Sequence, residues 1–140
     1  MSDDEYRRKG ELAMRLRRNG DYEAAYHLFV ELISRFPQKF GMHLMAGDMA
    51  DKTNRFEEKE KHFKNASRLY PTHEFASVLY FHALLDNGRK SDAILEMKRF
   101  YSVGKPNEYR QLIKDLKEGA IKSESSKKFL LQIEDALNTT

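Results

Sequence analysis

The feature that most constrains this chain is a pattern that returns every 34 residues. It is clearest at residues 19–37, where Gly20 allows a tight turn and Pro37 stops a helix. Between them, apolar side chains recur at the spacing of one helix face: Tyr22, Ala25, Phe29, Leu32, Ile33 and Phe36. Steps of 34 residues also relate Gly20, Asn54 and Gly88, and Phe29, Phe63 and Met97. The pattern predicts an array of helical repeats.

The period and its contents resemble the tetratricopeptide repeat (TPR), which has an aromatic residue, glycine, alanine and proline at set places within 34 residues. The matching residues are Leu12, Ala13, Leu16, Ala25, Phe29 and Pro37, then Ala46, Gly47, Ala50, Phe63, Ala66 and Pro71, then Tyr80, Phe81, Leu84, Ala93 and Met97. Lys59 stands where the family usually has alanine, and the leading aromatic residue is replaced by Lys9, His43 and Ser77. The resemblance implies an all-α fold, an α-solenoid of antiparallel helix pairs in a TPR-like superhelix.

A single TPR-like domain is expected over residues 1–140, with repeats at about 6–39, 40–73 and 74–106 and a C-terminal helical cap at 107–138. The expected helices are 3–18, 22–36, 40–52, 56–70, 73–87, 91–103 and 124–137, with another directly after Pro106. In that additional helix the 34-residue frame would bury polar residues, whereas the apolar stripe is Tyr109, Leu112, Ile113 and Leu116. It must therefore be rotated or shifted relative to the array. The alternatives to a cap are docking of a second subunit and folding back into the groove of the array.

Composition and motifs exclude several kinds of chemistry. The chain has no cysteine, which removes disulfides, thiolate zinc sites and cysteine nucleophiles. Its five histidines never stand three or four residues apart in one helix, and its glycines form no phosphate loop. We therefore expect no enzyme, no cofactor and no metal site, with the histidines as partly exposed or hydrogen-bonded helix residues. No stretch predicts a membrane span or a secretory signal, so the expected location is cytoplasmic.

Charged residues are concentrated in two stretches. The first helix is expected to bury Leu12, Ala13 and Leu16, and it carries six cations: Arg7, Arg8, Lys9, Arg15, Arg17 and Arg18. These cations are interpreted as the solvated face of a terminal repeat, with RNA binding as the alternative. A net charge of +3 falls short of what nucleic-acid binding would need as its only argument. The interleaved charges at 57–61 predict an exposed, salt-bridged helix face.

The family frame implies which residues line a concave groove, since the first helix of each pair faces it. These are Gly10, Met14, Arg17 and Arg18 in repeat one, Leu44, Met45, Asp48 and Asp51 in repeat two, and Phe75, Val78, Leu79 and His82 in repeat three. The family's carboxylate clamp for acidic chaperone tails is disfavoured, because its positions hold Gly10, Met14, Met45, Phe75 and Leu79. The groove instead mixes apolar side chains with a basic end at Arg17 and Arg18 and an acidic patch at Asp48 and Asp51.

This set of residues favours a non-catalytic protein–protein interaction scaffold that binds a peptide or helix of a partner protein. A general adaptor is one form of the hypothesis. The other is a sequestering partner, either a secretion chaperone or a toxin-immunity protein. The chain is similar to the small three-repeat chaperones of type III secretion, which also place a final helix after the third repeat.

Overall fold

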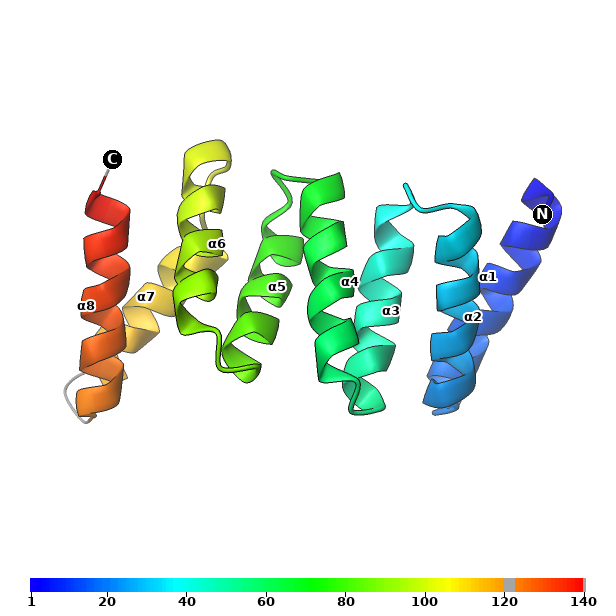
Figure 1. The fold of residues 1–140 in the computed structure, drawn as a ribbon, viewed down its shortest axis with the longest axis horizontal. Coiled ribbons are helices and arrows are strands. Elements are labelled where there is room, and N and C mark those ends of the chain that lie inside the picture. The colour runs from blue at the N-terminus through cyan, green and yellow to red at the C-terminus, as the bar shows by residue number, and fades with distance from the viewer. Residues whose placement is uncertain (120–122, 140) are drawn as a thin grey trace. The chain divides into compact units, whose positions relative to one another are not determined.

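The computed structural model describes residues 1–119 and 123–139. Over these ranges the chain forms eight α-helices and no strand (Figure 1). The helices are α1 Asp3–Arg18, α2 Tyr22–Arg35, α3 Phe40–Lys52, α4 Phe56–Leu69, α5 Glu74–Asp86, α6 Lys90–Val103, α7 Glu108–Gly119 and α8 Glu124–Asn138. The ranges predicted from the sequence agree to within one residue at each end. No helix in the described ranges is both long enough and apolar enough to cross a membrane.

The turns within the three predicted repeats have the same structure. Gly20, Asn54 and Gly88 all adopt positive φ, at 83°, 62° and 73°. The residue after each donates its backbone N–H to a carbonyl five positions earlier, at 2.9 Å from Asp21, 2.7 Å from Arg55 and 2.8 Å from Arg89. This is the Schellman arrangement, in which a residue in the left-handed region closes a helix C-terminus. The 34-residue step of the sequence is therefore a repeated backbone turn.

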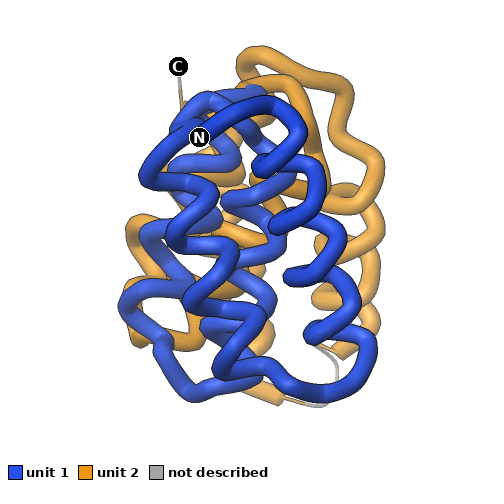
Figure 2. The backbone as a smooth tube through the Cα atoms, turned by 90° about the vertical axis from the view of Figure 1, so that its right-hand side faces the viewer, with its two compact units in different colours: residues 1–70 blue, residues 71–140 orange. Residues whose placement is uncertain are grey.

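The chain divides into two compact units, Met1–Tyr70 and Pro71–Thr140 (Figure 2). The first contains α1 to α4, which pack in chain order as antiparallel neighbours (Figure 1). Its core is built from buried side chains of the first three helices: Ala13, Ala25, Tyr26, Phe29, Leu32, Ala46, Met49 and Ala50. Gly47 and Phe63 join α3 to α4 at close range. A single domain over residues 1–140 stays a prediction.

Two expectations about side-chain exposure in the first unit are wrong. Leu12 is 41% exposed, because α1 is the terminal helix of the unit and packs mainly on α2. Lys59 and Glu60 are buried, although the charge pattern predicts an exposed face. Lys59 occupies the slot of a small residue by extending its stem, and its Nζ donates to Asp51 Oδ1 at 2.9 Å.

In the second unit, α5 pairs with α6 and α7 pairs with α8, while α7 also packs on α5 and α8 on α6. The core combines all four helices through Phe81, Leu84, Ala93, Met97, Phe100, Tyr109 and Ile133. The apolar stripe predicted for α7 is confirmed. Tyr109 is fully buried, and the stripe's other members, Leu112, Ile113 and Leu116, pack against the same core.

Candidate functional site

In the first unit, the predicted groove residues of α1 and α3 are half-buried or exposed. Met14 and Met45 pack against the core of the unit, so part of their apolar surface is already covered. Leu44 is half-buried, Arg18 is exposed, and no neighbouring atom lies within 4 Å of a Cβ built on Gly10. Met14 and Met45 therefore contribute to the core of the unit and offer only part of their surface to a partner.

The charges expected as separate patches on this face are paired with each other. Arg17 Nε donates to Asp48 Oδ2 at 3.2 Å, and each of these side chains is 35% exposed. Asp51 accepts from the buried Lys59. The charges of Arg17, Asp48 and Asp51, which were expected to contribute to a basic end and an acidic patch of the groove, are therefore balanced locally.

The cations of α1 are also largely paired. Arg7 contacts Asp4 and Glu11, Arg8 contacts Asp4, and Lys9 contacts Glu31 of α2. A cation that is already paired with a carboxylate is less available to pair with a phosphate. These ion pairs therefore weaken the case for a nucleic-acid surface on this helix.

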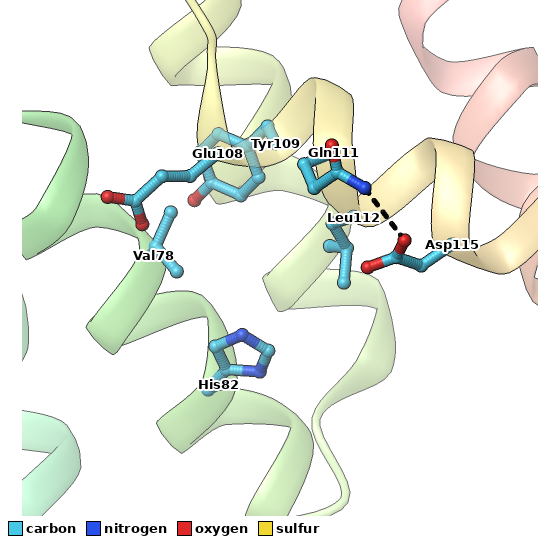
Figure 3. Close-up of a pocket in the computed structure, with 7 residues that line it drawn as sticks. All are labelled: Val78, His82, Glu108, Tyr109, Gln111, Leu112 and Asp115. Atoms are coloured by element: carbon cyan, nitrogen blue, oxygen red, sulfur yellow. Dashed lines mark hydrogen bonds between the residues drawn. The ribbon is translucent and has the colours of Figure 1, made fainter.

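In the second unit, α5 and α7 line a cavity of about 250 Å³ that is open to solvent (Figure 3). Its lining residues are Val78 and His82 from α5, and Glu108, Tyr109, Gln111, Leu112 and Asp115 from α7. Two of the four groove residues predicted on α5 thus lie in the cavity. Phe75 is 50% exposed and Leu79 is half-buried, and neither lines it.

The α7 residues of the cavity were missed by the sequence argument. The available signal was the loss of the 34-residue frame after Pro106, which puts Gln111 and Asp115 where a repeat would have packing residues. Polar residues at those positions indicated a face turned toward solvent. What the pattern left open was which neighbouring helix that face would lie beside.

A buried polar network fixes α7 against α5 and α6. Ser77 Oγ donates to Glu96 Oε2 at 2.6 Å and lies 2.8 Å from the Tyr109 hydroxyl. Arg99 neutralises Glu96 through two hydrogen bonds of 2.9 and 2.7 Å. Burial raises the pKa of the Tyr109 hydroxyl far above its usual value, so it stays protonated and can donate. Ser77 is one of the positions where the family's aromatic residue is absent, and its small side chain leaves room for the Tyr109 hydroxyl.

The start of α7 is held by Glu74 of α5. Its carboxylate accepts the backbone N–H of Asn107 at 2.8 and 3.0 Å and that of Tyr109 at 3.1 Å. A negative charge at a helix N-terminus satisfies unpaired N–H groups and is stabilised by the helix dipole. The α7 wall of the cavity is therefore held in position by side chains of α5, which forms the other wall.

The residues that line the cavity offer groups that can contact a partner. Gln111 Nε2 donates to Asp115 Oδ1 at 2.9 Å (Figure 3). The phenol of Tyr109 already lies 2.8 Å from Ser77 Oγ. Within residues 1–119 and 123–139, no three His, Cys, Asp or Glu side chains cluster as a metal site would require. The cavity can bind through apolar contact, carboxylates and an imidazole.

The histidines of the first unit have structural partners, as expected. His43 is buried, and its Nε2 lies 2.8 Å from the Pro37 carbonyl. His62 Nε2 lies 3.3 Å from the Tyr26 hydroxyl. Burial, with a smaller contribution from the nearby His43, lowers the pKa of His62 to about 4, so this ring is neutral at pH 7.

Repeated helix pairs joined by one type of turn define a TPR-like helical repeat fold, and the comparisons with solved structures confirm it. The chain is similar to a point mutant of MamA, with 20% identity, a TM-score of 0.64 and coverage of 75% of this chain and 77% of that one. A double mutant of MamA matches with 14% identity, a TM-score of 0.69 and coverage of 99% and 80%. These are likenesses of fold.

A third similar structure is the type III secretion chaperone SycD of Yersinia enterocolitica in complex with a peptide of the translocator YopD. It has 15% identity to this chain and a TM-score of 0.68, and the match covers 95% of each chain. No protein-family model matches the sequence, and no curated protein is significantly similar to it.

Proposed function

We propose that this protein is a non-catalytic interaction scaffold that binds a peptide or helical segment of a partner protein. The observation that carries the proposal is the cavity between α5 and α7, where Val78 and His82 of the predicted groove meet residues of α7. Beside it on α5, Phe75 is 50% exposed. Covering the exposed half of such a ring, about 100 Å², would contribute roughly 2–3 kcal/mol to binding.

A sequestering chaperone is the form of this function that we favour. SycD, which has the same fold over nearly its whole length, is described in complex with a peptide of a translocator. By analogy, the present chain would hold an extended or helical segment of another protein until its release. A toxin-immunity protein would use the same kind of surface, and the identity of the bound protein distinguishes the two.

RNA binding through α1 is the weaker hypothesis. Four of the six cations of α1 make ion pairs with carboxylates, which leaves Arg15 and Arg18 as the cations for which no ion pair is seen in the described residues. Binding through these two would fall steeply with salt and disappear in a variant with both replaced by glutamate.

The test is affinity capture from native lysate at low and high salt with three matched proteins. One is the wild type, one carries Phe75→Glu, and the control carries Leu131→Glu on α8. Leu131 is 58% exposed and belongs to the same unit, so its replacement introduces the same charge at a similar exposure.

One stoichiometric protein retained at high salt by the wild type and the control, and lost with Phe75→Glu, would support the proposal. Equal capture by all three proteins would contradict it, because the binding surface would then lie elsewhere. Capture of nucleic acid that is lost at high salt would favour the RNA hypothesis.

A further inference from the structure

The charges of α7 are unevenly distributed around the helix. Successive helical residues are about 100° apart, so Glu108 and Asp115, seven positions apart, lie on one face about 10 Å from each other along the axis. Both line the cavity. Arg110 and Lys117 fall on the opposite side of the helix, Lys114 and Glu118 lie between the two sides, and all four are exposed. The face turned toward the cavity is therefore anionic, although the helix as a whole is nearly neutral.

The remaining lining residues add no positive charge that would cancel these carboxylates. None of the seven lining residues is lysine or arginine. Asp115 accepts a hydrogen bond from the neutral amide of Gln111, which orients the carboxylate and leaves its charge uncompensated. Glu74 stands nearby on α5, but its charge is taken up by the N–H groups at the start of α7. Both carboxylates of the cavity are exposed to solvent, so a partner can reach them.

Apolar surface lies between the two charges. Val78 and Leu112 are half-buried residues that face the cavity from α5 and α7 (Figure 3). A volume of about 250 Å³ is smaller than typical small-molecule pockets, which start at roughly 300 Å³, and is of a size for one or two protein side chains. Phe75 continues the apolar surface along α5, one helical turn before Val78.

We propose that this cavity selects a cationic amphipathic segment of the partner. One apolar side chain of the segment seats on Val78 and Leu112, and lysine or arginine residues beside it pair with Glu108 and Asp115. This inference rests on the proposed function and adds to it the chemistry of the bound segment. The same carboxylates repel phosphates, so the site discriminates against nucleic acid and acidic peptides.

The experiment is selection from a random peptide library displayed against the wild-type protein, followed by affinity measurements with the selected peptides. Peptides enriched in lysine or arginine within one helical turn of a large apolar residue are expected. Their affinity should fall about threefold to tenfold for the Glu108→Gln/Asp115→Asn variant, since each exposed ion pair contributes modestly. The matched control is Glu124→Gln/Asp135→Asn, which neutralises two exposed carboxylates of α8 in the same unit.

A reciprocal measurement keeps the result independent of any change in folding. Replacing the peptide's basic residues by glutamine should weaken binding to the wild type and have little further effect on the neutralised variant. The inference would be overturned by selected peptides that show no enrichment in basic residues, or that bind the wild type and the Glu108→Gln/Asp115→Asn variant equally. If those peptides still lost binding with Phe75→Glu, the proposed function would stand. If no peptide were selected, or if Phe75→Glu also left the affinity unchanged, the inference and the proposed function would both be contradicted.

Discussion

Replacing Gly47 by alanine tests the packing on which the first unit depends. A Cβ built on Gly47 would lie 2.3, 2.6 and 2.8 Å from three ring carbons of Phe63. Real Cβ atoms essentially never approach another atom this closely, so the ring or the helix must move. Phe63 is only 5% exposed, and its ring has little room to retreat. The substitution therefore strains the contact between α3 and α4.

The magnitude follows from two opposing effects. Alanine is a better helix former than glycine by about 1 kcal/mol, which would stabilise the variant. Overpacking a filled core costs about 1–3 kcal/mol, and three ring atoms in conflict at once place this case at the upper end. We expect Gly47→Ala to lower the free energy of unfolding by about 1–2 kcal/mol.

Gly41 provides a control on the same helix. A Cβ there would meet no atom within 4 Å, so Gly41→Ala keeps the gain in helix propensity without the clash. It should raise the free energy of unfolding by about 0.5 kcal/mol, less than the full propensity difference because the position is in the first turn. The two alanines are thus predicted to act with opposite sign.

Urea denaturation monitored by circular dichroism measures both variants. The combination of Gly47→Ala with Phe63→Leu removes the conflicting ring carbons, so the double variant should be less destabilised than the sum of the single changes by about 1 kcal/mol. The reasoning is refuted if Gly47→Ala is as stable as Gly41→Ala, or if its effect and that of Phe63→Leu simply add.

Three further predictions concern stability and are measured by the same denaturation assay. The pKa of His62 is about 4 in the folded chain and about 6.5 when unfolded, so the unfolded state takes up this proton first and stability is lost as the pH falls from 6.5 to 4. The variant His62→Gln should abolish about 2 kcal/mol of that loss, after allowance for the partial exposure of the ring. Ser77→Ala should lower the free energy of unfolding by about 2–3 kcal/mol, because it leaves Glu96 and the Tyr109 hydroxyl each without one buried hydrogen-bond partner. Tyr109→Phe should lower it by only about 1 kcal/mol. Equal effects of the two variants would contradict the network. At Asn54, where φ is 62°, alanine should cost about 1 kcal/mol and glycine should be neutral or stabilising; no difference between them would contradict the strained turn.

The array was predictable because its determinants are local in sequence. A residue that tolerates positive φ at Gly20, Asn54 and Gly88 fixes each hairpin, and the apolar stripes between those turns fix which helix faces are buried. These signals recur at a constant step, so each copy supports the interpretation of the others. The rotation of α7 was predictable for the same reason, since its stripe departs from the repeat frame.

The charge balance of the predicted groove depends on residues distant in sequence. Arg17 and Asp48 are 31 positions apart, and their pairing follows from the distance between α1 and α3. A sequence shows that both charges exist, but their separation in space decides whether they form two patches or one ion pair. The same limit explains Lys59, because a lysine in an alanine slot is predicted to be exposed until a carboxylate such as Asp51 is placed within reach.

The position of α7 beside α5 depends on the small side chain of Ser77. Serine at position 77, in place of an aromatic residue, makes space that the Tyr109 hydroxyl occupies, and Glu96 then supplies the acceptor for Ser77. With Tyr109 turned into the core, the helix geometry sends Glu108, Leu112 and Asp115 toward α5. An aromatic residue at position 77 would displace Tyr109 and rotate this acidic face away. The network that stabilises α7 should therefore also determine binding, and Ser77→Ala is expected to weaken peptide affinity although position 77 does not line the cavity.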